Sequence, residues 1–494
     1  MPSPSKSPRR GDFKNGLSKC NCILKCTWLN KKLEKVELNL HINYLLTSIL
    51  YTHQKSPFGG FRGLCFMIYY SNGSVETNLS AEDLKKGLYE ALQKMGHRRK
   101  VLAIPPDFTR FPSRAGELTE FAWEYFGETL TDVLPALGTH TPMTDDQISK
   151  MYGNTPRRIF RDHDWRNDVI TLGYVPAEYV KEVSEGAVDF QWPAQVNRLL
   201  QEGGYDLILS IGQVVPHEVV GMANYNKNIF VGTGGAEGIN KSHFIGAAYG
   251  MEKMMGRANT PVRKVFNYAT DHFASHLPIV YVQTVVGLNK QGMLQTYGLF
   301  IGDDFEVFDR AASLSLQVNF EMVDKPLKKV LVWLDPTEFK STWLGNKSIY
   351  RTRMAIAEGG ELIVLAPALK EFGEDKEIDR LIRKYGYFGT PATLKATKEN
   401  CELKENLGAA AHLIHGSSEG RFSITYCPGK ESGNITREEI ESVGFRWDDI
   451  DSVMKKYHFD TLKEGFNTMP HGEEIFYISN PALGLWAHKD RFGF

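Results

Sequence analysis

The sequence has few cysteines, almost no net charge and no long apolar run. Six cysteines in 494 residues, three of them crowded at Cys20, Cys22 and Cys26, make no disulfide framework, so we expect a reducing, cytoplasmic compartment. The formal net charge of −1 gives no electrostatic case for a nucleic-acid partner or an anionic membrane. No apolar run approaches the roughly 18–20 residues of a membrane-spanning helix. A content of 42% apolar and 24% charged residues is typical of a soluble globular protein.

Several common enzyme motifs are missing as well. The chain has no P-loop, no GxGxxG dinucleotide fingerprint and no H-E-x-x-H zinc motif. The cluster CNCILKC at Cys20 to Cys26 lacks a second half with zinc spacing. These absences count against a conventional phosphatase or hydrolase.

The chain divides into four stretches. Residues 1–66 begin MPSPSKSPRRG and show no sustained period, so we interpret them as a disordered or non-native extension rather than a targeting or regulatory segment. Residues 67–327 and 328–475 then read as two α/β domains, which suits a length too great for one core. We expect residues 476–494 to pack back on the first domain.

Strands alternate with helices from Ser80 onward. Ser80 precedes an amphipathic helix over 81–95, and apolar strands alternate with further helices along the chain. In the second half we expect a helix through 346–360 between strands at 328–336 and 361–367. This order predicts two α/β domains with mainly parallel sheets and an active site in the cleft between them. Ligands in such sheets bind beyond the carboxyl ends of the strands, so the loops there are the candidates.

Two loops that follow predicted strands carry suitable residues. The first holds Asp107, Thr109 and Arg110, whose planar guanidinium suits a carboxylate or phosphate. The second, GTHTP, holds His140. Taken alone, a structural turn and a surface histidine explain these loops at least as well as a site does.

A third loop is richer in functional groups. His217 follows an apolar strand, Lys227 comes ten residues later, and His243 comes sixteen residues after that. Gly234 and Gly235 lie between them and would expose backbone N–H groups to a phosphate. The lysine and histidines could supply a covalent anchor, a base and a metal ligand. An ordinary glycine-rich loop beside a helix start is an equal alternative on these residues alone.

Together these segments resemble the nickel-dependent lactate racemase family over roughly residues 68–475. Five motifs occur in the family's order, with its spacings of ten and sixteen residues. They are the Asp-x-Thr-Arg loop at Asp107, GTHTP with His140, VVPH with His217, the pair Lys227 and His243, and Lys347, twelve residues before Gly359.

The resemblance implies a nickel-pincer nucleotide, a pyridinium-3-thioamide-5-thiocarboxylate mononucleotide that binds nickel. Lys227 would be joined to it, and His243 would be the protein's nickel ligand. His140 and His217 would be the acid and base of a 2-hydroxy acid racemase or epimerase, an isomerase working by proton-coupled hydride transfer through a 2-keto acid. Further cofactor contacts fall on Asp107, Thr109, Arg110, Gly234 and Gly235, and substrate contacts on Arg110, Trp343 and Lys347.

One departure bears on the substrate. Where the lactate enzymes have a Tyr-Gln pair before the second-domain lysine, this chain reads Trp343-Leu344. We therefore expect lactate or a larger, more polar 2-hydroxy acid, with cofactor-synthesising enzymes as the other partners. The alternative function is a nickel-pincer cofactor carrier or a non-catalytic nucleotide-binding homologue. The presence of both His140 and His217 argues against it, because a carrier needs no base pair.

Overall fold

The computed structural model describes residues 67–494 apart from 290, 483 and 493–494. Contacts group residues 66–494 into one compact unit. The prediction for residues 1–66 lies outside the described residues. Within the described part of the chain, none of the helices has the length and apolarity needed to cross a membrane.

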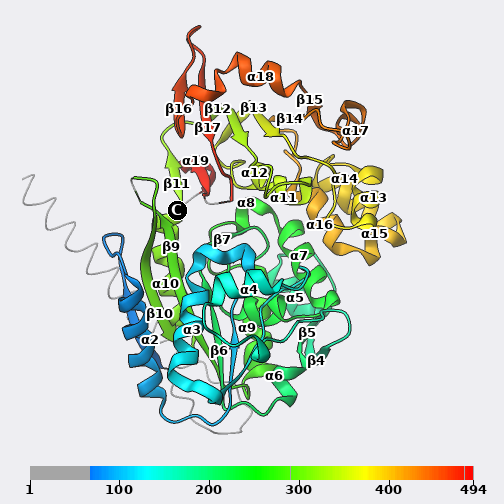
Figure 1. Ribbon diagram of the computed structural model, residues 1–494. Coiled ribbons are helices and arrows are strands. Elements are labelled where there is room, and N and C mark those ends of the chain that lie inside the picture. The colour runs from blue at the N-terminus through cyan, green and yellow to red at the C-terminus, as the bar shows by residue number, and fades with distance from the viewer. Residues whose placement is uncertain (1–66, 290, 483, 493–494) are drawn as a thin grey trace, which may run out of the picture. The chain divides into compact units, whose positions relative to one another are not determined.

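The first sheet has six strands in the order β1-β10-β9-β6-β2-β3 (Figure 1). Strands β9, β6, β2 and β3 run parallel, and β1 and β10 are antiparallel to their neighbours. The strands are β1 (Ile68–Gly73), β2 (Val101–Ile104), β3 (Leu130–Val133), β6 (Leu207–Gln213), β9 (Ile279–Leu288) and β10 (Leu294–Gly302).

Helices cover both faces of this sheet because successive strand residues point to opposite sides. Val101 and Ala103 of β2 pack with α2, α3 and α4, whereas Leu102 and Ile104 pack with α7, α9 and α10. As predicted, Ser80 caps α2 by accepting a hydrogen bond from the Asp83 N–H. The helices are α2 (Ala81–Met95), α3 (Ala115–Phe126), α4 (Asp145–Tyr152), α5 (Ala177–Val183), α6 (Arg198–Glu202), α7 (Ala236–Tyr249), α8 (Met251–Met254), α9 (Pro261–Ala269) and α10 (Phe305–Asn319).

The second sheet has the order β15-β14-β13-β12-β17-β16, parallel except for β16. Its strands are β12 (Leu327–Trp333), β13 (Ile356–Ala366), β14 (Ser423–Pro428), β15 (Arg446–Trp447), β16 (Gly465–Thr468) and β17 (Glu474–Ile478). Its helices are α11 (Thr342–Gly345), α12 (Lys347–Tyr350), α13 (Lys376–Tyr385), α14 (Thr390–Glu399), α15 (Cys401–Glu405), α16 (Leu407–His415), α17 (Arg437–Ser442) and α18 (Ile450–Lys456). The two sheets confirm the predicted α/β class with mainly parallel strands. The domain limits at 327 and 475 stay predictions.

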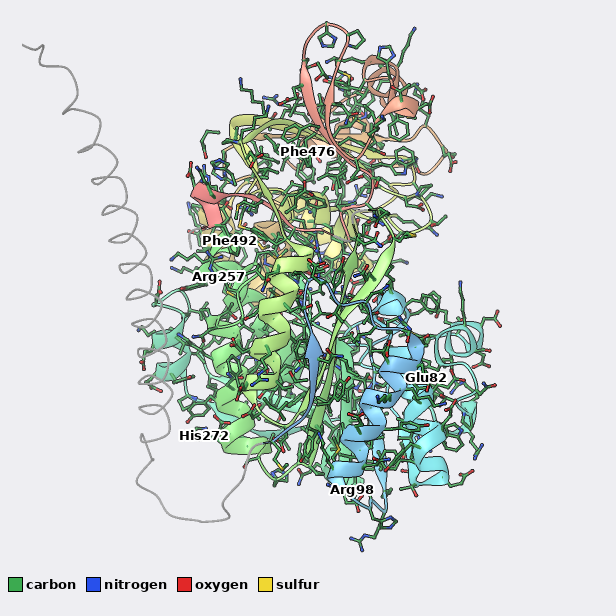
Figure 2. The ribbon with its side chains drawn as sticks, turned by 90° about the vertical axis from the view of Figure 1, so that its left-hand side faces the viewer. Glu82, Arg98, Arg257, His272, Phe476 and Phe492 are labelled. Carbon is green, nitrogen blue, oxygen red and sulfur yellow. The ribbon has the colours of Figure 1, made fainter. Side chains whose placement is uncertain are left out.

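The last residues return to earlier parts of the chain. Strand β18 (Trp486–His488) pairs in parallel with β11 (Glu321–Val323). Beyond it, in α19 (Lys489–Phe492), the Phe492 ring lies 4.5 Å from the Arg257 guanidinium, and the two residues are neighbours in Figure 2. Two two-stranded antiparallel sheets complete the fold: β4 (Val169–Val175) with β5 (Trp192–Asn197), and β7 (Pro216–His217) with β8 (Gly221–Met222).

The predicted helix through 346–360 is wrong. Helix α12 ends at Tyr350, and strand β13 already begins at Ile356. Backbone pairing with the C-terminal segment explains the difference, because Trp486 N–H donates to Arg351 and His488 N–H donates to Met354. These partners lie far away in sequence, so local helical propensity does not decide the segment.

Candidate active site

Three loops leave the carboxyl ends of neighbouring parallel strands. Asp107 follows β2, His140 follows β3, and His217 lies just beyond β6. A backbone bond of 2.8 Å from Gly138 N–H to the Gly232 carbonyl ties the His140 loop to the segment after Lys227. The loops therefore meet at the edge where open α/β sheets bind ligands.

Asp107 and His140 form a hydrogen-bonded pair. Asp107 Oδ2 lies 2.6 Å from His140 Nδ1, and its other oxygen accepts bonds from the Thr109 hydroxyl and N–H. Burial opposes ionisation of both groups, but their mutual bond and charge prevail: the pKa of His140 is raised and that of Asp107 is lowered. The His140 side chain is 41% exposed, so its Nε2 edge remains open to a ligand.

His217 has the opposite environment. It is buried, and its Nδ1 accepts a 3.1 Å hydrogen bond from the Val219 N–H. Burial, together with the charges of Lys227 and Arg110, holds the pKa of His217 well below its ordinary value, although Glu218 opposes this. One histidine of the pair therefore favours its protonated form, and the other favours its neutral form.

Positive charge accumulates around these histidines. Burial and the nearby Arg110 lower the pKa of both Lys227 and Lys347 to about 8. Neither Arg110 nor Lys227 has a side-chain hydrogen bond or ion pair with any residue that the structure describes. Lys347 makes one long ion pair, with Glu338 at 4.0 Å. Cations without partners suit an anionic ligand.

His243 lies on α7 and presents one free nitrogen. Its Nδ1 donates to the Ile239 carbonyl at 2.7 Å, which leaves Nε2 with a lone pair. Burial lowers the pKa of His243, so the ring is neutral. A neutral imidazole fixed by a backbone carbonyl is the form in which histidine binds metals.

Close packing against other parts of the chain explains why residues 234 and 235 are glycines. A Cβ at Gly234 would meet the Phe230 carbonyl at 2.0 Å, and one at Gly235 would meet the Gln195 amide at 2.6 Å. Thr109 stays bonded to Asp107, as described above. No ligand is needed to explain either glycine, so their assignment to the cofactor stays a prediction.

Trp343 packs within the second half of the chain. Its ring stacks on His412 at 4.4 Å, and its backbone N–H donates to Phe372. No contact in the described structure joins it to His140 or His217. Its predicted substrate contact therefore has a packing alternative.

Two acidic residues near the site were not predicted from the sequence. Glu218 Oε2 lies 3.7 Å from His217 Nδ1, and the exposed Glu374 lies in the electrostatic field of His140 and Lys347. Although its side chain is exposed, the neighbouring protein partly removes water from the carboxyl group, and this desolvation is the main cause that raises the pKa of Glu374. The position of Glu218 directly after His217 was the available clue, whereas nothing local marks Glu374.

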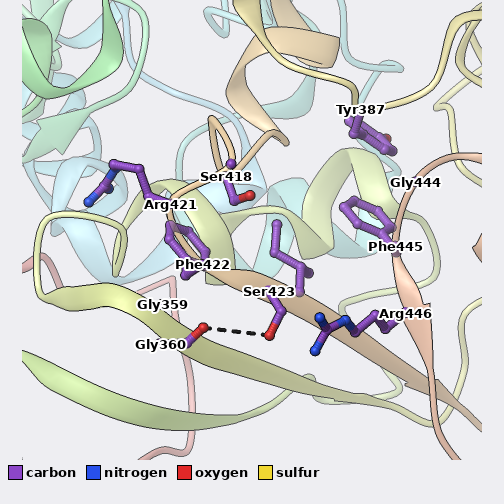
Figure 3. A pocket seen from close by; sticks show the side chains of 12 residues that line it. Gly359, Gly360, Tyr387, Ser418, Arg421, Phe422, Ser423, Gly444, Phe445 and Arg446 are labelled. Carbon is purple, nitrogen blue, oxygen red and sulfur yellow. Dashed lines mark hydrogen bonds between the residues drawn. The ribbon is translucent and has the colours of Figure 1, made fainter.

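A cavity of about 370 Å³ lies elsewhere, on the second sheet (Figure 3). Its lining includes Ser418, Arg421 and Arg446 but none of the histidines above. Residues 416–420 read GSSEG and fit a G-x-S-x-G pattern around Ser418. They connect helix α16 to strand β14, the reverse of the strand-to-helix turn of a hydrolase nucleophile. The pattern around Ser418 therefore does not form a nucleophile elbow.

A metal held by protein side chains alone is not apparent: the described residues contain no group of three or more His, Cys, Asp or Glu side chains suited to an ion. The side chains at the site instead fit a metal whose remaining ligands come from a bound cofactor. His243 offers one neutral nitrogen, Lys227 offers an amine that is partly neutral near pH 8, and Arg110 offers an unpaired guanidinium.

Comparisons with known proteins agree with the fold. Residues 85–255 match the family model of the lactate racemase N-terminal domain. A crystal structure of a Thermotoga maritima protein is 24% identical, with a TM-score of 0.70 over 84% of this chain and 100% of that chain. The lactate racemase apoprotein from Thermoanaerobacterium thermosaccharolyticum is 16% identical, with a TM-score of 0.62 over 84% of this chain and 94% of that chain.

Such identities establish a shared fold, and the comparison with curated sequences finds no match. The domain match covers the loops of Asp107, His140 and His217 and the helix of His243. The match confirms the predicted resemblance for residues 85–255, which carry a lactate racemase N-terminal domain, and the fold of the chain is similar to that of the lactate racemase apoprotein.

Proposed function

We propose that this protein is an isomerase that interconverts the two configurations at C2 of a 2-hydroxy acid, using a nickel-pincer nucleotide. The observation that carries the proposal is the pair of unlike histidines, His140 with a raised pKa and His217 with a lowered one. A racemase needs one protonated and one neutral group at the same pH, and these two environments supply them.

Lys227 and His243 would hold the cofactor. The lowered pKa of Lys227, about 8, leaves part of its amine neutral and able to form a covalent bond. His243 Nε2 would complete the nickel coordination, while Thr109, Gly234 and Gly235 would lie along the nucleotide. When bound, the cofactor supplies a reversible acceptor for the hydride at C2 of the substrate.

The two histidines would move the hydroxyl proton. One would take it from the substrate as C2 is oxidised to a planar 2-keto acid, and the other would give a proton to the oxygen as C2 is reduced from its opposite face. Asp107 holds the His140 ring through Nδ1, so Nε2 is the nitrogen that meets the substrate.

The substrate carboxylate would bind between Arg110 and Lys347, in a cleft between the two halves of the described chain. The charge of Arg110 lowers the pKa of Lys347, which supports the proposal that the two cations bind one carboxylate together. Lactate or a larger, more polar 2-hydroxy acid fits, with Trp343 near its distal end. Cofactor-synthesising enzymes would be the remaining partners.

The test is to purify the protein from cells that make the cofactor and to measure nickel and the loss of optical rotation over chiral 2-hydroxy acids. We expect about one nickel per chain and interconversion of at least one acid. His243→Ala should lose the nickel, and His140→Ala or His217→Ala should each keep it while interconversion falls about 100-fold or more.

His272→Ala is the matched control. Like His243, His272 donates from Nδ1 to the carbonyl four residues earlier, at 2.9 Å, but it is not one of the predicted site residues. Nickel and turnover should be unchanged in this variant. A protein that never binds nickel would contradict the proposal. Nickel binding without interconversion of any acid would support a cofactor carrier instead.

A further inference from the structure

His217 makes a hydrogen bond that conflicts with its proposed role as a base. Because Nδ1 accepts from the Val219 N–H, the neutral ring carries its proton on Nε2. In that tautomer, Nε2 can donate a proton to a ligand but cannot take one. To act as a base through Nε2, His217 must hold its proton on Nδ1 and needs an acceptor there.

Glu218 stands beside that nitrogen. Its Oε2 lies 3.7 Å from His217 Nδ1, so a shift of about 1 Å would make a hydrogen bond of ordinary length. The carboxylate is mostly buried, with 22% of the side chain exposed. Although burial opposes ionisation, the charges of His217 and Arg351 keep the pKa of Glu218 well below its usual value.

The surroundings of Glu218 leave it able to move. Its carboxylate has two hydrogen-bond partners, the Tyr350 hydroxyl, whose bond is weak, and its own backbone N–H, while Arg351 and His415 act on it through their charges. Arg351 donates to the carbonyls of Pro216 and Gly484, and its buried Nε makes no hydrogen bond. The carboxylate therefore experiences the charges of both Arg351 and His217, and no ion pair with Arg351 is formed in the described structure.

The other proposed acid/base histidine, His140, already has a carboxylate bound to its Nδ1 atom. Asp107 already bonds His140 Nδ1 at 2.6 Å, which leaves His140 Nε2 facing outward. We propose that Glu218 is the positioning residue for His217: its carboxylate accepts the Nδ1–H when the ring takes the substrate's hydroxyl proton on Nε2. Before that step the neutral ring changes tautomer through solvent: Nε2 releases its proton to water, Nδ1 takes one from water, and Nδ1–H donates to Glu218 in place of the bond from the Val219 N–H. Nε2 then takes the substrate's hydroxyl proton, and the ring becomes an imidazolium paired with Glu218. The inference rests on the proposed two-histidine function.

The other charged groups facing His217 work against its protonation. They are Lys227 and Arg110, with a smaller effect from His243. Of the groups that act on His217 within the described residues, Glu218 alone favours the charged ring. Removing its charge should therefore make His217 harder to protonate.

Glu218→Gln is the test variant, because it keeps the shape and removes the charge. In the protein without cofactor, imidazole nitrogen NMR follows the tautomer and pKa of His217, assigned by the loss of its signals in His217→Gln. We expect the pKa of His217 to fall by about 1 unit or more in Glu218→Gln. In Glu218→Asp, the pKa of His217 should stay close to its wild-type value, because the negative charge remains even though the shorter side chain reaches less far toward Nδ1.

The rate of the first half-reaction in the enzyme with bound cofactor is the second measurement. In a single turnover with one enantiomer, the cofactor's absorbance reports the first half-reaction. Glu218→Gln and Glu218→Asp should slow it at least about 10-fold for the enantiomer that uses His217 as base and less than about 3-fold for its mirror image. Asp107→Asn should show the reverse preference. Glu185→Gln is the control, since Glu185 also contacts a tyrosine and a cation, Tyr249 and Lys253, away from the histidines.

An unchanged His217 pKa in a folded Glu218→Gln protein would overturn the inference and leave the proposed function standing. Equal slowing of both enantiomers would overturn it as well. If the pKa falls as expected but the wild type interconverts no acid, the Glu218 contact is upheld and the proposed function fails.

Discussion

At the scale of the residue, Asp107 and His140 illustrate what sequence reasoning could reach. Each lies in a loop after a strand, and family resemblance predicted both as site residues. The pairing of Asp107 with His140 across 33 residues was not predicted, because two loops must first be placed on neighbouring strands. Glu374 was missed for the same reason, because its environment depends on charges brought by other segments, whereas Glu218 was overlooked although it directly follows His217.

The Asp107–His140 pair should make stability depend on pH. The pKa of His140 is raised above 6.5, so the stabilisation is fully present below 6.5 and is lost as pH rises through the raised value. The pKa of Asp107 is lowered below 3.8, so the stabilisation is present above 3.8 and is lost as pH falls through the lowered value. We expect Asp107→Asn to reduce the free energy of unfolding most between these limits and less at about pH 9.

Denaturant titrations of wild type and variant across this range measure the effect. In a His140→Gln background, the same Asp107 substitution should have a cost that no longer changes between about pH 5 and pH 9. A wild-type advantage that stays constant with pH, or grows as pH rises from 6.5, would show that the pair is not ionic.

At the scale of the element, alternation of apolar and polar stretches predicted the two parallel sheets and the loops at their carboxyl ends. It failed at 346–360, where pairing with the C-terminal strand β18 overrides the helical pattern. It also could not show that α7, which carries His243, packs on α16 through Ala247, Ala411 and Ile414. Such contacts join segments more than 160 residues apart, and nothing in either segment alone encodes them.

Glu252 of α8 gives a prediction at this scale. It pairs with Arg353 at 3.3 Å and Arg421 at 2.7 Å, and the Arg353 side chain is only 4% exposed. Glu252→Gln should leave a buried guanidinium without a counter-ion. We expect unfolding to become easier by about 2–3 kcal/mol, below the cost for a fully buried pair because Glu252 is 28% exposed.

Urea denaturation measures this change. Glu441→Gln is the matched control, since it breaks an exposed helical pair with Arg437 and should cost less than about 1 kcal/mol. Equal effects of the two substitutions would contradict the view that Glu252 stabilises a buried cation.

At the scale of the whole molecule, the family match covers the part that carries both histidines, Lys227 and His243. The second sheet lies outside that match, yet it contributes Lys347, Arg351 and Glu374 to the charged surroundings of the site. Under the proposed function, substrate choice would depend on this second part, where Trp343-Leu344 departs from the pattern of the lactate enzymes. For this reason the sequence supports the proposed type of reaction more strongly than it supports any particular 2-hydroxy acid as substrate.

The most direct test of the account follows the hydrogen at C2. A 2-hydroxy acid that the loaded enzyme interconverts is prepared with deuterium at C2 and converted in ordinary water, and the product is examined by mass spectrometry. Hydride transfer between substrate and cofactor predicts that the product of opposite configuration keeps its deuterium. Release of the deuterium to solvent in step with interconversion would mean that a base removes C2–H as a proton, and it would contradict the proposed mechanism.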